Sequence, residues 1–476
     1  MAFGKGWVWL LAATLIAGGA AAAPSLYRTA VLGSGVMAQL LCSGTFVSRR
    51  DPEAVMAEDL SGPGYELLWF FRWRVDRETK SVTASLFGSG RRTAIFRDGL
   101  GCTLAIGRTE AELRAQADGV FPASPPSNPD ALWPDGERVD QDAAPQDVDA
   151  SALNAGVEAL FVEPDPAHPR RTRALVVVHG GRIVAERYAP HFDATMPLIG
   201  WSMAKTAINA LTGMLVQDGT VKLTDKALLP EWQRDEDPRR EITLDQLLRM
   251  TSGLEFNEDY ADESSDAIQM LFVQGDNARF AASKPLASAP GTHWHYSGGT
   301  SNIIALILRQ HFADEKAYLR FPQEHLFGPL GMRTAVLEPD SAGTFVGSSF
   351  MYASARDWAR LGLFFLRDGV WQGRRLLPEG WVAYTVTPTE SSPNDGYGAH
   401  VWLKLPDSSQ LGEPPMPEDA YYMLGYDQQI VAAVPSRDLV IVRLGLTRDE
   451  SAWDHARELA PIVRAFSRPQ GPIGAR

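Results

Sequence analysis

The sequence predicts an α+β fold for residues 151–470, preceded by a small β-rich module at residues 36–120. Two hairpin patterns, at residues 174–188 and 430–444, lie near the two ends of the larger region. Apolar stretches with helical spacing lie between these hairpins, and another stretch follows the second hairpin. Because strands and helices do not alternate regularly, the pattern favours one antiparallel sheet, with its first and last strands as neighbours, over a doubly wound parallel sheet.

Length and composition exclude several classes of protein. The chain has 476 residues, of which 45% are hydrophobic and 22% are charged, as in an ordinary folded protein of two or three domains. Its formal net charge of -13 argues against a nucleic-acid partner, since binding to phosphates requires a surplus of Lys and Arg. Its two cysteines cannot supply a four-thiolate zinc site or an iron–sulfur cluster.

Residues 1–35 are predicted to be a signal peptide or a retained membrane anchor. Lys5 precedes an apolar run at residues 7–23, which ends in an A-x-A pattern before Pro24. The run is also nearly long enough to cross a bilayer, so cleavage and retention both remain open. We therefore expect an exported protein, either periplasmic or tethered to the inner membrane and facing the periplasm.

The predicted module at residues 36–120 contains short runs typical of strands. In FRWRVD, from residue 71, apolar and polar side chains alternate, and Gly-rich turns separate the later runs. In an oxidising compartment Cys42 and Cys102 are expected to form a disulfide, with two buried free thiols as the alternative. Residues 121–150 are rich in Pro and in acidic side chains and cannot form a core, which indicates a linker or an extended strap across the surface.

The elements at the ends of the larger region follow from turn chemistry and apolar spacing. Strands at residues 174–178 and 182–188 are joined through two consecutive glycines, which allow the positive φ angles of a tight turn. Strands at residues 430–434 and 439–444 are joined by the turn PSRD. A last helix is predicted from its apolar face, which consists of Trp453, Ala456, Leu459, Ile462, Val463 and Phe466.

A candidate nucleophile lies in Ser202-Met203-Ala204-Lys205, at the start of an apolar run with helical spacing. Residues three apart share one face of a helix, so the Ser202 hydroxyl and the Lys205 amine are expected to meet. A lysine can activate a serine when burial or nearby positive charge lowers its pKa, and the backbone N–H of Ser202 would stabilise an oxyanion. Taken alone the motif is weak, and a helix cap followed by a surface lysine is the better interpretation.

A second candidate is Tyr296, which the segment PGTHWHYSG at residues 290–298 brings out of a turn before another apolar helix. The alternative is an ordinary half-buried ring that caps this helix. Trp294 and Gly298 from the same turn are candidates for the substrate pocket. His293 and His295 flank the motif without a third ligand, so we expect no metal, and nothing in the sequence indicates an organic cofactor.

With Ser202 and Lys205 on one helix and Tyr296 on a later loop, the sequence resembles the β-lactamase-related serine hydrolases. This family includes class C β-lactamases, serine esterases, DD-peptidases and 6-aminohexanoate-dimer hydrolases. The resemblance covers residues 170–445, includes segments such as LLRMTSGL from residue 247 and LPEGW from residue 377, and is greatest for the 6-aminohexanoate-dimer hydrolase branch. It implies a β-lactamase/transpeptidase-like fold, with a helical subdomain beside an antiparallel sheet flanked by helices.

The resemblance also implies roles for individual residues. Ser202 would be the acylated nucleophile, Lys205 its base and Tyr296 the group that shuttles the proton. The Lys-Thr-Gly of many β-lactamases is absent, and the asparagine expected two positions after the tyrosine is replaced by Gly298. Both departures favour an amidase or esterase that acts on a small-molecule or short-peptide acyl substrate.

Where this branch often carries Gly-His-x-Gly-Gln, the chain has the segment GYDQQ at residues 425–429. Tyr426 would occupy the histidine position, and Gln429 would provide the second oxyanion N–H from its backbone. Tyr426 and Asp427, together with Trp201 beside the serine, complete the candidates for the substrate pocket.

Three other interpretations compete with an amidase or esterase. The segment GWSMA around Ser202 nearly matches the nucleophile elbow of α/β-hydrolases, although residues 190–200 make an unconvincing preceding strand. A non-catalytic protein that binds peptides or peptidoglycan would keep the fold without turnover. A DD-peptidase or β-lactamase-like cell-wall enzyme would suit an exported location.

Overall fold

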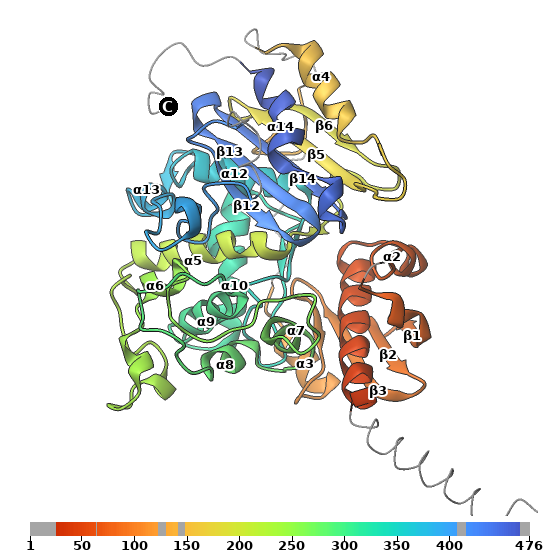
Figure 1. Ribbon diagram of the computed structural model, residues 1–476, viewed down its shortest axis with the longest axis vertical. Coiled ribbons are helices and arrows are strands. Elements are labelled where there is room, and N and C mark those ends of the chain that lie inside the picture. The colour runs from red at the N-terminus through yellow and green to blue at the C-terminus, as the bar shows by residue number, and fades with distance from the viewer. Residues whose placement is uncertain (1–24, 63, 122–129, 141–147, 407–415, 467–476) are drawn as a thin grey trace, which may run out of the picture.

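The computed structural model describes residues 25–62, 64–121, 130–140, 148–406 and 416–466. The larger part of the molecule contains a five-stranded antiparallel sheet in the order β12-β13-β14-β5-β6 (Figure 1). Its strands are β5 (Thr172–His179), β6 (Arg182–Tyr188), β12 (Tyr421–Gly425), β13 (Gln429–Val434) and β14 (Leu439–Gly445). Strand β14 pairs with β5, which confirms that the first and last strands are neighbours.

Helices cover both faces of this sheet. Helix α12 (Ala355–Leu366) packs on one face, and α4 (Ala150–Ala159) and α14 (His455–Arg464) pack on the other (Figure 1). Alternate residues of β5 contact the two layers, with Val176 in the cluster on the α12 side and Val177 in the cluster with α4 and α14. The continuous apolar run of β5 follows from this burial on both faces.

The helical subdomain lies below the sheet in Figure 1 and is arranged around α5 (Ala204–Gln217). Its other helices are α6 (Leu244–Leu248), α7 (Asp266–Phe272), α8 (Asn277–Ala282), α9 (Gly298–Arg309), α10 (Glu315–Phe321) and α11 (Gly328–Leu330). Helix α13 (Trp381–Thr385) lies beside the main sheet in Figure 1. A small sheet has the order β7-β9-β8, formed by β7 (Leu198–Ile199), β8 (Val336–Leu337) and β9 (Met351–Ala353). A short hairpin pairs β10 (Val370–Trp371) with β11 (Arg374–Arg375).

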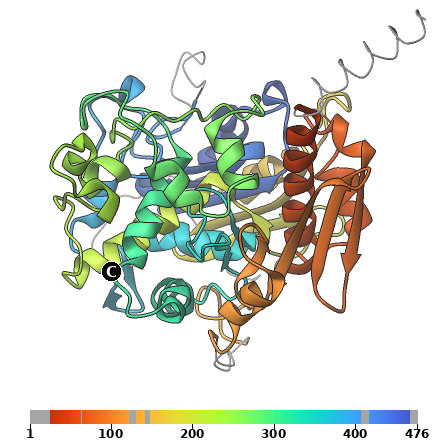
Figure 2. The same cartoon turned by 90° about the horizontal axis from the view of Figure 1, so that it is seen from below.

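The N-terminal module combines a helix, Ser25–Val47, with a four-stranded antiparallel sheet. The other elements of the module are α2 (Pro52–Glu58), β1 (Phe71–Asp76), β2 (Ser81–Leu86), β3 (Ser89–Arg97), β4 (Gly101–Leu104) and α3 (Glu110–Ala117). Figure 2 shows the helix between this sheet and the larger domain. Glycines permit both contacts, because a Cβ on Gly33 would overlap the Phe71 ring and one on Gly35 would overlap the Phe272 carbonyl oxygen.

The helix begins inside the segment 1–35 that was predicted as a signal peptide or anchor, and it continues into the predicted β-rich module. Residues 25–35 pack with that module in the structure, and residues 36–47 are helical. The helix is long and apolar enough to cross a membrane, yet 83% of its most apolar window is buried within the protein. Its apolar character follows from contact with protein on two sides. The predicted apolar run at residues 7–23 lies outside the described residues.

Two links hold the module together and attach it to the larger domain. A disulfide joins Cys42 in the helix to Cys102 in β4. Next to this disulfide, the Glu338 carboxylate of the larger domain accepts hydrogen bonds from the Cys102 N–H (2.7 Å), the Ser43 hydroxyl (2.8 Å) and the Gln39 amide (2.8 Å). Burial raises the pKa of Glu338 to about 8, although these hydrogen bonds act in the opposite direction.

We expect Glu338 to make the stability of the protein depend on pH. The pKa of Glu338 is higher in the folded chain than in the unfolded chain. Between pH 4.5 and about 8 the folded state therefore keeps a proton that the unfolded chain has lost. The stabilisation that is fully present below pH 4.5 is lost as the pH rises toward 8. The urea midpoint of the wild type should therefore fall between pH 5.5 and pH 8.5, and Glu338→Gln should show a smaller fall.

The matched control is Glu78→Gln, which changes an exposed glutamate in the turn after β1 and should reproduce the pH dependence of the wild type. Equal pH dependence of the midpoint in the wild type and Glu338→Gln would contradict the prediction.

The described part of the Pro-rich segment forms a strap across the larger domain. Trp133 is buried, and the Arg360 guanidinium of α12 donates to the carbonyl oxygens of Pro134 (3.0 Å) and Gly136 (2.6 Å). Arg360 also pairs with the Glu137 carboxylate at 2.9 Å. Residues 130–140 are therefore fixed against α12.

Candidate active site

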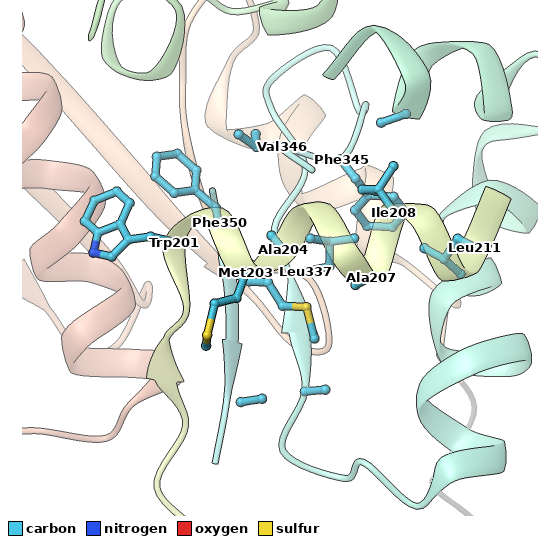
Figure 3. Packing of buried hydrophobic residues seen from close by; sticks show 14 of the residues in the cluster. Trp201, Met203, Ala204, Ala207, Ile208, Leu211, Leu337, Phe345, Val346 and Phe350 are labelled. Atoms are coloured by element: carbon cyan, nitrogen blue, oxygen red, sulfur yellow. The ribbon is translucent and has the colours of Figure 1, made fainter. Parts of the chain in front are cut away.

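Ser202 lies in a 3-10 turn, Trp201–Met203, that leads directly into α5. The residue before it, Trp201, has a φ of 47°, a left-handed conformation that is uncommon for a bulky side chain and occurs often at functional sites. Gly200 fixes the turn, since its N–H donates to the Met351 carbonyl of β9 at 2.9 Å. The turn leaves Ser202 half-buried while its neighbours Trp201 and Met203 are buried (Figure 3).

The structure brings Lys205 to the Ser202 hydroxyl. Lys205 Nζ lies 3.0 Å from Ser202 Oγ and 3.1 Å from the carbonyl oxygen of Ser348. The lysine side chain is almost fully buried, at 1% exposure, so it is not the surface lysine of the alternative interpretation. A buried amine in contact with a serine hydroxyl is one arrangement that can activate a serine for acyl transfer.

Tyr296 completes the group of three predicted residues. Its ring centroid lies 4.8 Å from Lys205 Nζ, in a cation–π contact. The ring is held on its other sides by Trp402 and Tyr397, at centroid distances of 5.5 and 5.9 Å. Trp294, a predicted pocket residue, packs against the same aromatic group, with its ring centroid 6.4 Å from that of Tyr296.

Glu258 is a part of the site that the sequence analysis missed. Its carboxylate accepts a hydrogen bond from the N–H of Gly298 (2.8 Å) and another from the Tyr260 hydroxyl (3.1 Å). Burial raises the pKa of Glu258, and the nearby Lys205 cation opposes that shift. The backbone N–H of Gly298, a predicted pocket residue, thus helps to hold the Glu258 carboxylate in place. Glu258 lies in a loop without a recognisable sequence motif.

His400 was also missed and packs behind Lys205. Its Nδ1 lies 3.0 Å from the Lys205 backbone oxygen, and its Nε2 lies 3.1 Å from Ser301 Oγ. Burial, assisted by the Lys205 cation, lowers the pKa of His400 to about 3, so the ring is neutral at physiological pH. Its contacts hold the start of α5 against α9, which positions Lys205.

The segment at residues 425–429 approaches the serine turn from the main sheet. A Cβ on Gly425 would overlap the Gly200 carbonyl oxygen, so β12 ends directly beside the turn. The amide of Gln429 donates to the Gly445 carbonyl (2.7 Å) and accepts from its N–H (2.8 Å). The side chain of Gln429 is thus committed to the sheet, and only its backbone remains as the predicted oxyanion donor.

The two neighbouring pocket candidates in this segment have different surroundings. Tyr426 is 44% exposed and packs edge-on to Trp201, with ring centroids 5.8 Å apart, and it stacks on Tyr260 at 5.7 Å. Asp427 is buried, and its Oδ1 lies 3.8 Å from Arg448 Nε. The carboxylate of Asp427 therefore belongs to a charged cluster at the interface with the N-terminal module.

The interpretation as an α/β-hydrolase elbow is wrong for this chain. An elbow requires a strand of the central sheet immediately before the nucleophile. The strand before Ser202 is β7, which has two residues and belongs to the small three-stranded sheet.

Comparisons with known proteins identify relatives of this chain. A 6-aminohexanoate-dimer hydrolase of Paenarthrobacter ureafaciens is 25% identical over 223 residues, which are 44% of this chain and 56% of the relative. The matched region thus spans little more than half the length of that relative.

Solved structures share the fold. A Bacillus anthracis protein assigned as a 6-aminohexanoate-dimer hydrolase has a TM-score of 0.55 and 20% identity, covering 72% of this chain and 91% of that one. A penicillin-binding protein homologue of Caulobacter crescentus has a TM-score of 0.50 and 17% identity, covering 66% and 97%. The sequence profile described as Beta-lactamase matches residues 157–462, well over half of the chain. The protein therefore belongs to the beta-lactamase family.

Proposed function

We propose that this protein is a serine hydrolase that cleaves amide or ester bonds through an acyl-enzyme on Ser202. The observation that carries the proposal is the 3.0 Å contact between Lys205 Nζ and Ser202 Oγ, with the Tyr296 ring against the same amine. Family membership supports a hydrolase, because the named relative and the structural neighbours include hydrolases.

In the proposed reaction Lys205 takes part as the neutral amine. Ser202 Oγ attacks the substrate carbonyl carbon and gives its proton to Lys205 Nζ, which passes a proton on to the Tyr296 hydroxyl as that hydroxyl releases its own. The backbone N–H groups of Ser202 and Gln429 stabilise the oxyanion. Tyr296 then returns the proton to the leaving amine or alcohol as the bond to the carbonyl breaks. A water molecule repeats these steps on the acyl-enzyme and releases the acid.

Within this reaction class, we propose an amidase or esterase of the 6-aminohexanoate-dimer hydrolase type. The absence of Lys-Thr-Gly removes the cation that commonly holds a β-lactam carboxylate. A DD-peptidase is the second candidate, favoured by the likeness of the fold to a penicillin-binding protein homologue.

We also propose that the protein is exported to an oxidising compartment, which the Cys42–Cys102 disulfide supports. Fractionation of cells into periplasm and membranes tests the location.

The function is tested with a panel of chromogenic esters, linear amides, a β-lactam and a muropeptide digest. We expect turnover of esters or linear amides, together with a covalent adduct of an acylating probe on the Ser202 peptide in mass spectrometry. Cleavage confined to muropeptides would establish the DD-peptidase instead. A chain that neither turns over substrate nor accepts the probe would be the non-catalytic binding protein.

We expect Tyr296→Phe to lower kcat by about 10²- to 10³-fold, the usual contribution of a positioned acid or base. The ring remains over Lys205, so only the hydroxyl is lost. The measurement is steady-state hydrolysis of one ester with a good leaving group and one amide with a poor one.

The amide should be affected more, because its leaving amine must be protonated whereas a phenolate leaves unaided. Tyr397→Phe, which removes a hydroxyl from the neighbouring ring, is the matched control. Equal rates for Tyr296→Phe and the wild type on the amide would remove Tyr296 from the mechanism.

A further inference from the structure

A cavity of about 380 Å³ lies between the N-terminal module and the larger domain, next to the serine turn. This volume lies within the range of about 300–1,000 Å³ that is typical of small-molecule sites. One wall comes from the helix Ser25–Val47 and from the segment before β1, and the other comes from α7 and from the serine turn. Neither part of the chain forms the cavity alone.

The lining is apolar in its interior and acidic at its rim. The helix contributes Leu32 and Val36, the segment before β1 contributes Leu68, and α7 contributes Ile268 and Phe272. The exposed residues Glu66 and Glu263 also line the cavity. Among the described residues that line the cavity there is no Lys, Arg or His. Such a site accepts a neutral apolar chain and offers no cation to hold a carboxylate or a phosphate.

Three aromatic residues in the cavity wall lie between the cavity and the proposed catalytic residues, which do not themselves line it. Trp201, which lines the cavity, is adjacent to Ser202, and its side chain points from the serine turn toward the N-terminal helix (Figure 3). Tyr260 and Tyr426 line the cavity as well and stack on each other at 5.7 Å. The Tyr260 hydroxyl donates to Glu258, whose carboxylate also accepts from the N–H of Gly298, two residues after Tyr296.

We propose that this cavity binds the apolar chain of the substrate while the reacting carbonyl lies at Ser202. The substrate class is a neutral ester or amide that carries a medium-length alkyl chain on its acyl side or on its leaving group. The inference rests on the proposed hydrolase function and extends it, since it assigns one wall of the substrate site to the N-terminal module. Burial of the chain between Val36, Phe272 and Trp201 provides the binding free energy.

The test is the dependence of hydrolysis on chain length in two ester series. One series is 4-nitrophenyl esters from acetate to decanoate, and the other is acetate esters of alcohols from ethanol to decanol. In one of them kcat/KM should rise about four-fold for each methylene that the cavity buries, the factor that corresponds to the transfer free energy of a methylene. The series that shows the rise identifies which side of the substrate occupies the cavity.

Variants then locate the effect. Val36→Phe and Thr29→Phe each enlarge a half-buried side chain that lines the cavity. Each should lower the ratio of kcat/KM between the eight-carbon and two-carbon esters by about sixteen-fold, as expected when two methylenes are displaced. Val162→Phe introduces the same ring at an exposed position outside the cavity and should keep the wild-type ratio. Thermal melting of each variant verifies that it is folded.

Binding without turnover separates the cavity from the chemistry. Octanamide should bind Ser202→Ala more tightly than butanamide in calorimetry, by the same factor per methylene. In Ser202→Ala/Val36→Phe this difference in affinity should be about sixteen-fold smaller, because two methylenes are displaced. Wild-type protein that hydrolyses no ester, amide or muropeptide would refute the hydrolase, while this binding measurement would still report on the cavity. Rates and affinities that do not vary with chain length, or that vary equally in the cavity variants and Val162→Phe, would overturn the inference.

Discussion

Ser202→Ala is expected to lower kcat for any substrate of the protein by at least about 10⁴-fold, because no other group can accept the acyl chain. The fold should be unchanged. The hydroxyl is half-buried, and its described partner Lys205 keeps a second contact to the Ser348 carbonyl. The measurement combines initial rates on the best ester of the panel with the melting temperature of the variant.

Ser283→Ala is the matched control, since it removes a serine hydroxyl from an exposed position at the end of α8. It should keep the wild-type rate. Hydrolysis by Ser202→Ala at a rate comparable with the control would show that another residue is the nucleophile, and the acyl-enzyme mechanism would then be wrong for this protein.

Lys205→Met is expected to lower kcat by about 10³- to 10⁴-fold, near the upper end of the contribution of a general base. Methionine has a similar length, so the variant tests the amine more than the packing. The Ser202 hydroxyl would lose its 3.0 Å partner and become a poor nucleophile. Single-turnover acylation should slow as much as steady-state hydrolysis, because the base is needed for the first attack.

Lys226→Met removes an amine that is exposed and paired with Glu241, and it serves as the control. It should leave the rate unchanged within about two-fold, as expected for a surface ion pair. Lys205→Met with near-normal acylation would transfer the role of the base to another group. Melting temperatures are needed here as well, since Lys205 is buried and its removal can lower stability.

Local patterns predicted four of the five strands of the main sheet, all but β12, and two of the proposed catalytic residues. The hairpin of β5 and β6 and that of β13 and β14 are encoded by short apolar runs around tight turns, and the structure confirms both. Ser202 and Lys205 are one helical turn apart, so their contact follows from helix geometry alone. Tyr296 approaches Lys205 through tertiary packing, and its place was predicted from the resemblance to a family.

Other features depend on contacts between distant parts of the chain. Glu258 and His400 lie next to the catalytic group because loops and α9 pack there, and neither residue carries a local signal. The helix Ser25–Val47 was not predicted. A helix that contacts protein on two sides is apolar around most of its circumference, so it lacks the one-sided apolar spacing by which a helix is recognised in a sequence.

The helix Ser25–Val47 has a consequence for how specificity could evolve or be engineered in this protein. The residues proposed to cleave the substrate lie within residues 157–462, the part of the chain that matches the family. The helix lies outside that part and forms one wall of the cavity proposed to bind the alkyl chain. A mutant library confined to the helix can therefore select among chain lengths without altering Ser202, Lys205 or Tyr296. Exchange of the whole module between homologues would be the corresponding natural route to new preferences.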